Sequence, residues 1–122
     1  AISAHSHAIK FDPLYVPARV NRGLAYLEFQ DYIAATIDFS EAIRLEPTNA
    51  QHYFYRGVAL AKRGLTERAI ASYNDAIRLN PNYAEAYFNR SVTYSQLGKS
   101  AEASRDRAKA MELNPTLTQS RR

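Results

Sequence analysis

The segment at residues 69–81, AIASYNDAIRLNP, recurs along the chain in varied form. Related phrases, such as AIRLEP and AMELNP, end at prolines that stand 34 residues apart: Pro13, Pro47, Pro81 and Pro115. Alanines keep the same step at Ala35, Ala69 and Ala103. A fixed period of this length is typical of repeat proteins, whose units pack mainly against their neighbours. The sequence therefore predicts a stacked array of similar units.

The period divides the chain into three full units and part of a fourth. The full units are at residues 16–47, 50–81 and 84–115. Residues 1–13, AISAHSHAIKFDP, match the second half of a unit, so we expect the second helix of a truncated repeat there. Residues 116–122 are expected to be a C-terminal tail or the start of a further helix. We expect one domain, because 122 residues with a 46% hydrophobic composition suffice for one ordinary core.

Each full unit is predicted to form two helices. The first helices are expected at residues 16–29, 50–63 and 84–97, and the second helices at residues 31–45, 66–79 and 100–113. Gly64 and Gly98 suit the position just past a helix end, and the Glu-Pro and Asn-Pro steps prevent the second helix from continuing. Small residues such as Gly57 and large ones such as Tyr73 lie on the facing stripes, which favours interdigitation. The predicted fold class is all-α.

These columns resemble the tetratricopeptide repeat, a 34-residue pattern with an aromatic, a small residue, a tyrosine, two alanines, an aromatic and a proline. The resemblance covers residues 1 to about 115. It implies a right-handed α-solenoid of stacked antiparallel helix hairpins, whose first helices line a concave face that usually binds a peptide or a helix of another protein. It implies no catalysis. The sequence departs from the pattern at Arg19, Gln30 and Arg107, so looser packing is expected at both ends of the array.

Composition and charge narrow the function classes. The net charge of +4 comes from 16 basic and 12 acidic residues that are spread along the chain, so nucleic acid is not the expected partner. No apolar run reaches the roughly 18 residues that a spanning helix requires, so we expect no membrane insertion. Without cysteine there is no disulfide framework. The compartment stays open, with the cytoplasm as the default.

Residues that could carry chemistry do not converge in the sequence. His5 and His7 are two positions apart, so on a helix they point in different directions and make a weak metal site. His52 stands alone, and the sequence contains neither a glycine-rich phosphate loop nor a Gly-x-Ser-x-Gly turn. We therefore expect no catalytic residue, no metal site and no cofactor, and we expect that the protein is not an enzyme.

A second face of the first helices, about 140° from the core face, carries the candidate binding site. Its central columns are apolar: Val20, Phe54 and Phe88, followed by Leu24, Val58 and Val92. Residues able to hydrogen-bond border these columns: Asn21, Tyr55 and Asn89 on one flank, with Glu28, Lys62 and Gln96 at the other edge. A contiguous exposed apolar strip usually marks an interaction site, so the sequence predicts an apolar concave groove for a protein or peptide. Alternatively, adjacent first helices press together through the same side chains.

The phrase Asn89-Arg90-Ser91 resembles part of a carboxylate clamp, the family site that holds the acidic C-terminus of a chaperone. Phe54 and Val58 stand where that clamp needs a lysine and an asparagine. We therefore reject a carboxylate clamp for this chain.

Arginine recurs just before the small residue of each first helix, as Arg22, Arg56 and Arg90. An arginine stem can cover apolar surface while its guanidinium meets carbonyls or carboxylates of the neighbouring hairpin. A basic ridge for an acidic partner or nucleic acid is the alternative.

The two ends of the array should be incompletely covered. Ile2, Ile9 and Phe11 of the half unit lack their own partner helix, and residues 116–122 are too short to complete another. We therefore expect a fragment of a longer repeat array, or a chain that closes its ends by self-association.

The predicted function is protein–protein interaction, as an adaptor, assembly factor or targeting domain that binds a partner in the apolar groove. One alternative is a self-associating structural scaffold that meets other copies through the groove or the open ends. A further alternative is a non-catalytic domain of a larger enzyme.

Overall fold

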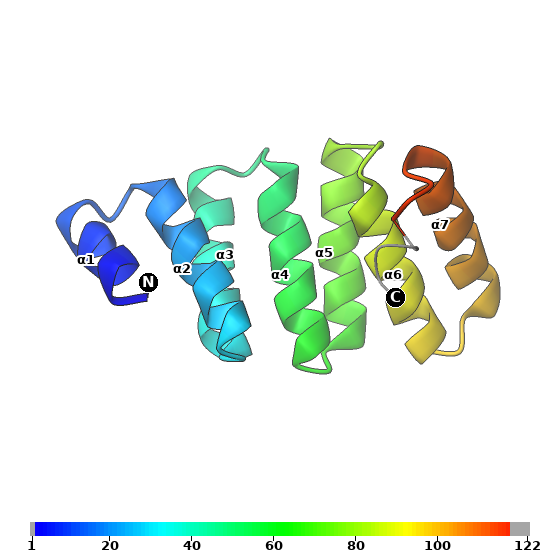
Figure 1. Ribbon diagram of the computed structural model, residues 1–122, viewed down its shortest axis with the longest axis horizontal. Coiled ribbons are helices and arrows are strands. Elements are labelled where there is room, and N and C mark those ends of the chain that lie inside the picture. Colours follow the sequence, from blue (N-terminus) through cyan, green and yellow to red (C-terminus); the bar gives the residue numbers. More distant parts are fainter. Residues whose placement is uncertain (1, 118–122) are drawn as a thin grey trace.

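The computed structural model describes residues 2–117, and all regular secondary structure in this range is α-helical (Figure 1). The helices are α1 (Ile2–Phe11), α2 (Val16–Glu28), α3 (Tyr32–Leu45), α4 (Ala50–Lys62), α5 (Thr66–Leu79), α6 (Ala84–Gln96) and α7 (Ser100–Leu113). The predicted all-α class is confirmed. The expected tail or further helix at residues 116–122 lies mostly outside the described residues.

Three hairpins stand side by side in chain order, formed by α2 and α3, α4 and α5, and α6 and α7 (Figure 1). Successive hairpins meet where α3 contacts α4 and where α5 contacts α6, and α1 packs on α2 at one end. The backbones of the first helices also approach one another across hairpins, α2 with α4 and α4 with α6, whereas those of the described second helices α3, α5 and α7 stay further apart. The first helices therefore line the inner side of the array. This arrangement is the predicted α-solenoid.

Several helix boundaries differ from the prediction by one residue. The first helices stop at Glu28, Lys62 and Gln96. The residue that follows each of them is the C-cap rather than part of the helix. Helix α3 begins at Tyr32 because the carboxylate of Asp31 caps it, accepting a hydrogen bond of 3.2 Å from the backbone N–H of Ala34.

The turn inside each hairpin passes through a residue with positive φ. These residues are Gln30 at 63°, Gly64 at 78° and Gly98 at 75°. Glycine adopts this region at little cost, whereas a residue with a Cβ atom is strained there. The sequence departure at Gln30 therefore keeps the turn geometry at an energetic cost that the other two hairpins avoid.

The first two hairpins each close around an aromatic ring that lies against a glycine. Phe39 is 0% exposed and Tyr73 is 1% exposed. A Cβ atom added at Gly23 would lie 2.6 Å from the ring of Phe39, and one added at Gly57 would lie 2.5 Å from the ring of Tyr73. The close approach of the ring is therefore what excludes a side chain at these two glycines. The predicted interdigitation of small and large residues is found here.

The last hairpin replaces both members of this pair. Arg107 stands in the position of the ring and is exposed. Ser91 stands in the position of the glycine, is buried, and donates its hydroxyl to the carbonyl oxygen of Phe88 at 2.6 Å. A hollow of about 250 Å³ is lined by these two positions together with Ala103 and neighbouring side chains. The looser packing expected at this end is therefore present.

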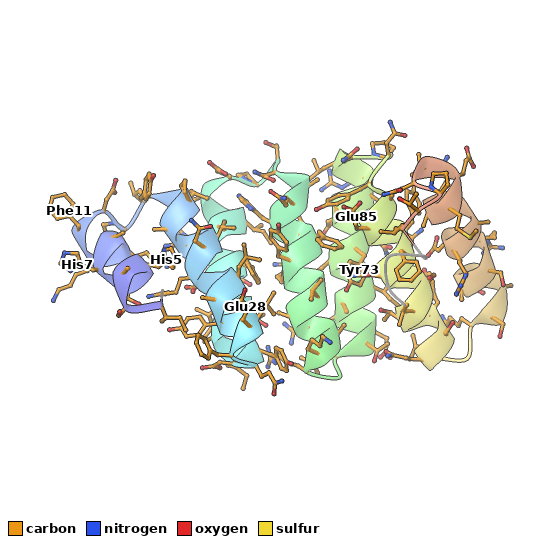
Figure 2. The ribbon with its side chains drawn as sticks, viewed as in Figure 1. His5, His7, Phe11, Glu28, Tyr73 and Glu85 are labelled. Carbon is orange, nitrogen blue, oxygen red and sulfur yellow. The ribbon has the colours of Figure 1, made fainter. Side chains whose placement is uncertain are left out.

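Helix α1 is covered by the array on one side only. Ile9 is 7% exposed because α1 packs on α2, the first helix of the next unit. Ile2 is half-buried. Phe11 is 88% exposed and points away from the array at its outer end (Figure 2).

Candidate interaction surface

The α2 part of the predicted groove is used largely to join hairpins. Val20 and Leu24 are half-buried and pack on a core cluster that includes Phe39 and Ala59. Tyr55 joins the same cluster, with its ring centroid 5.5 Å from that of Phe39. Here the alternative interpretation of the apolar columns, contact between adjacent hairpins, describes what these side chains do.

The aromatic members of the predicted groove, Phe54 and Phe88, are also packed against other residues. The ring centroid of Phe54 lies 5.0 Å from that of Tyr83 and 5.7 Å from that of Tyr55. A third ring, Tyr73, has its centroid 6.0 Å away. Aromatic pairs at such separations stabilise by about 0.5–1.5 kcal/mol beyond the area that they bury. Phe88, the next member of the column, is only 7% exposed.

An open pocket of about 150 Å³ lies between α4 and α6, one turn further along the same face. Predicted site residues that line it are Val58, Lys62, Asn89, Val92 and Gln96. Val92 is 43% exposed, so this part of the apolar strip faces solvent. We call this the α4–α6 pocket. The structure therefore brings together the C-terminal half of the predicted groove.

Tyr73 also lines the α4–α6 pocket and was not among the predicted site residues. It belongs to the second helix α5, which sequence reasoning assigns entirely to the core. Because Gly57 has no side chain, the ring of Tyr73 lies close against α4, where it lines the pocket. The pairing of a glycine column with an aromatic column was the signal that could have identified it.

Hydrogen bonds orient the polar groups of the α4–α6 pocket. Burial raises the pKa of the Tyr73 hydroxyl to about 12, and a hydrogen bond with the side chain of Asn89 opposes that rise only in part. The phenol is therefore neutral at neutral pH. The hydroxyl of Thr93 donates to the carbonyl oxygen of Asn89 at 2.9 Å. Lys62 is exposed and gives the rim a positive charge.

The two remaining predicted site residues also lie apart from the α4–α6 pocket. Asn21 and Glu28 belong to α2, where both are exposed, and neither lines the pocket. They occupy the same face of the first helices but a different hairpin.

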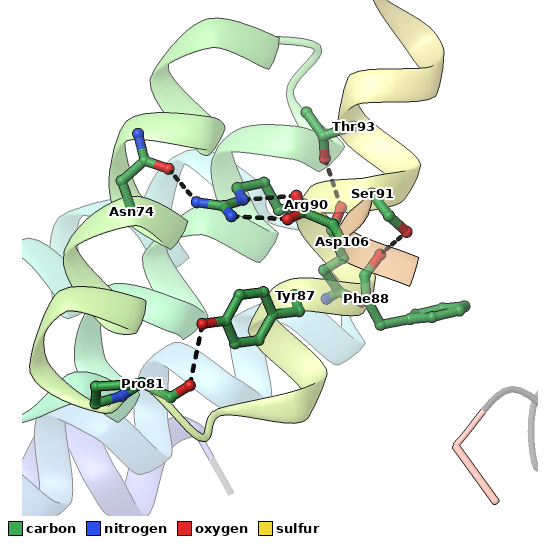
Figure 3. Close-up of polar contacts among 9 residues, drawn as sticks. Asn74, Pro81, Tyr87, Phe88, Arg90, Ser91, Thr93 and Asp106 are labelled. Atoms are coloured by element: carbon green, nitrogen blue, oxygen red, sulfur yellow. Dashed lines mark hydrogen bonds and ion pairs between the residues drawn. The ribbon is translucent and has the colours of Figure 1, made fainter. Parts of the chain in front are cut away.

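The arginine column has a structural role in the first and last hairpins. Arg22 donates to the two carboxylate oxygens of Asp38 at 2.8 and 2.6 Å. Arg90 donates to both oxygens of Asp106 at 2.7 Å and to the side-chain oxygen of Asn74 at 2.8 Å (Figure 3). The carboxylates belong to the same hairpin as the arginine, and a third bond of each arginine crosses to the preceding unit, from Arg22 to the hydroxyl of Ser6 at 3.2 Å and from Arg90 to Asn74. Bidentate pairs of this kind fix the relative position of the two helices.

The histidines lie on two helices, His5 and His7 on α1 and His52 on α4. His5 is half-buried and His7 is exposed on α1 (Figure 2). Buried His52 places its Nε2 2.9 Å from a carboxylate oxygen of Glu46. Across residues 2–117, no group of three His, Cys, Asp or Glu side chains could hold a metal ion. No described helix is long and apolar enough to cross a membrane.

Comparison with known families and structures agrees with this geometry. A family model described as tetratricopeptide repeat matches residues 16–49 and 84–117. Two further models, described as tetratricopeptide repeat and TPR repeat, match residues 39–71 and 59–98. A search of curated proteins gave no match.

Solved structures with the same fold include several of MamA. One crystal structure of MamA is 25% identical, with a TM-score of 0.91, over 97% of this chain and 69% of that chain. MamA from Desulfovibrio magneticus RS-1 is 19% identical, with a TM-score of 0.88, over 95% of this chain and 66% of that chain. The Arabidopsis OM64 TPR domain is 24% identical, with a TM-score of 0.81, over 83% of this chain and 84% of that chain. The chain thus spans about two thirds of the length of the MamA chains.

The repeat period, the stacked hairpins, the glycine–aromatic packing and the family matches converge. The chain belongs to the tetratricopeptide repeat family, whose members are in general protein-interaction or scaffold modules without catalytic activity.

Proposed function

We propose that the protein binds an apolar segment of a partner protein on the inner face of the array, with one side chain of that segment in the α4–α6 pocket. The observation that carries this proposal is the exposed apolar wall of Val58 and Val92 beside the polar groups of Asn89 and Gln96. Ligand sites commonly combine an apolar lining with a few polar groups that orient the ligand.

The volume of the α4–α6 pocket limits the side chain that it can take. A cavity of about 150 Å³ accommodates a benzene-sized group, so a leucine, methionine or phenylalanine side chain suits it. The amides of Asn89 and Gln96 can hydrogen-bond the backbone of an extended segment. Lys62 at the rim favours an acidic residue next to the apolar one.

The test is selection from a display library of random peptides, followed by affinity measurement by fluorescence anisotropy. Val92→Glu is the informative variant, because Val92 is 43% exposed and its replacement leaves the core intact. Met111→Glu on α7 is the matched control, with the same 43% exposure away from the pocket. We expect the selected peptides to share an apolar side chain and to bind Val92→Glu about tenfold more weakly or worse, since a charge would enter the apolar site. Equal binding to the native protein and to Val92→Glu would refute the proposal.

Self-association is a second candidate function that one observation favours. Phe11 is 88% exposed at the outer end of α1, where the array has no further hairpin against it in the described chain. If other copies cover this end, light scattering should show a mass that rises with concentration, and Phe11→Ser should abolish the rise. A constant monomer mass across the concentration range would exclude this role for Phe11.

A further inference from the structure

The middle hairpin lacks the carboxylate that its neighbours place against the recurring arginine. The position held by Asp38 and Asp106 in the outer hairpins is Ser72 in the middle one, one period from each. Arg56 donates its Nε–H to the hydroxyl oxygen of Ser72 at 3.0 Å. Within residues 2–117, Arg56 forms no ion pair, whereas Arg22 and Arg90 both do. The middle hairpin therefore holds a guanidinium whose usual partner group is absent.

A pocket of about 200 Å³ lies at this position, between the outer helices α3 and α5. Its polar lining consists of Arg56 from α4, Arg68 and Ser72 from α5, and Thr36 and Ser40 from α3. We call it the Arg56 pocket. It is lined by the second helices, whereas the α4–α6 pocket lies on the inner face, so the two sites can be occupied independently.

Electrostatics make the Arg56 pocket attractive to an anion. Burial of the Arg56 guanidinium lowers its pKa, and the positive charge of Arg68 adds to this effect. The charge of Asp75 opposes it, but this carboxylate lies 3.6 Å from a guanidinium nitrogen of Arg78 and does not line the pocket. The face of the Tyr53 ring, 5.5 Å from the Arg56 guanidinium carbon, gives only partial compensation. Two positive charges therefore meet in the pocket without a carboxylate between them.

The hydroxyl groups add hydrogen-bond donors. Because the Ser72 oxygen accepts from Arg56, its own hydrogen is available to a ligand. Ser40 is half-buried and also lines the pocket, and its hydroxyl can act as a further donor. Thr36 is not a further donor, because its hydroxyl hydrogen is already donated to the carbonyl oxygen of Tyr32 at 2.7 Å.

We propose that the Arg56 pocket binds a tetrahedral oxyanion of the phosphate class, either free phosphate or a phosphomonoester. The outer hairpins show that an oxyanion belongs against this arginine, since Asp38 and Asp106 place one there themselves. A dianion matches the two guanidinium charges, and its oxygens can accept bonds from Arg56, Arg68 and the serine hydroxyls together. A volume of about 200 Å³ leaves room for more than a carboxylate.

The decisive variant is Ser72→Asp, which gives the middle hairpin the carboxylate that its neighbours have. Titration with inorganic phosphate at constant ionic strength, followed through the Nε–Hε NMR signal of Arg56, should show saturable binding to the native protein. Ser72→Asp should raise the melting temperature without phosphate, because the new carboxylate pairs with Arg56. It should also abolish the phosphate-induced shift of the Arg56 signal, because the carboxylate occupies the place of the anion. Arg68→Gln, at an exposed position, should weaken binding about tenfold, and Arg63→Gln is the control that removes an equal charge outside the pocket.

O-Phosphoserine and acetate complete the titration. Tighter binding of O-phosphoserine than of inorganic phosphate assigns the site to a phosphomonoester, and the reverse order assigns it to free phosphate. Acetate that binds as tightly as phosphate would overturn the tetrahedral class. No saturable phosphate response, or a response that survives in Ser72→Asp and Arg68→Gln, would overturn the site. These measurements involve no peptide ligand, so their outcome is independent of whether the α4–α6 pocket binds a peptide.

Discussion

Replacement of Gly57 by alanine tests whether the approach of the Tyr73 ring to α4 is a rigid feature of the fold. In an exposed helix this change would stabilise by about 1 kcal/mol, because alanine has the higher helix propensity. Here the new Cβ atom would lie 2.5 Å from the ring of Tyr73, well inside the carbon–carbon optimum of about 3.5–4.0 Å. The ring must therefore move by about 1 Å or more.

The surroundings of the ring set the cost of that movement. Tyr73 is 1% exposed and packs with Leu60 and Ala69, so even a shift of the ring toward the α4–α6 pocket breaks these contacts. Overpacking of a core typically costs about 1–3 kcal/mol, and this site should fall towards the upper end. After subtraction of the propensity gain, we expect Gly57→Ala to lower the free energy of unfolding by about 1–2 kcal/mol. The melting temperature should fall by about 4–8 °C.

Thermal and urea unfolding monitored by circular dichroism measure this effect, and a second background reveals its cause. In Tyr73→Leu, whose smaller side chain leaves space beside α4, the same Gly57→Ala change should be neutral or stabilising. The change of sign between the two backgrounds separates ring contact from helix propensity. The reasoning is wrong if Gly57→Ala stabilises the native sequence, or if it destabilises both backgrounds equally.

Three further changes test other features. Gln30→Gly should raise stability by about 1 kcal/mol in thermal unfolding, because it relieves the positive φ of 63°; an unchanged melting temperature would show that the turn is not strained. Asp106→Ala should cost about 2–4 kcal/mol, since it leaves the Arg90 guanidinium, 18% exposed, without its carboxylate. Glu41→Ala, which breaks the exposed pair with Arg44, should change the free energy of unfolding little. Equal losses of free energy for Asp106→Ala and Glu41→Ala in urea titrations would therefore contradict the argument. Burial raises the folded-state pKa of Tyr73 from 10.0 to about 12, so its contribution to the free energy of unfolding should be present below pH 10 and be lost as the pH rises towards 12. A Tyr73 phenolate absorbance that titrates with the ordinary pKa would contradict this prediction.

The local pattern of the sequence was sufficient for the helices and their pairing. The step between Pro47 and Pro81 defines the unit, and Gly57 with Tyr73 predicts which faces of a hairpin meet. These properties depend on residues within one unit and on periodicity, which a single sequence contains. One-residue differences at helix ends arise from capping at positions such as Asp31, whose side chain accepts a hydrogen bond from one of the first backbone N–H groups of the helix.

The candidate site was only partly predictable, because the exposure of a first-helix side chain depends on the neighbouring hairpin. Val20 and Val92 occupy equivalent faces of the first helices, yet Val20 packs on a core cluster and Val92 is 43% exposed. Sequence periodicity predicts the direction of a side chain but not what the next unit places against it. Tyr73 lines the α4–α6 pocket for a different reason, because the absence of a side chain at Gly57 in its own hairpin decides where its ring lies.

The sequence by itself determined the repeat period, the helical hairpins and the family, because each is encoded in spacings that recur within the chain. Only the tertiary structure decided which part of the apolar strip is open, and only it placed Arg56 beside Arg68 in a pocket without a carboxylate. Both depend on contacts between units, where residues far apart in the sequence determine burial and charge pairing.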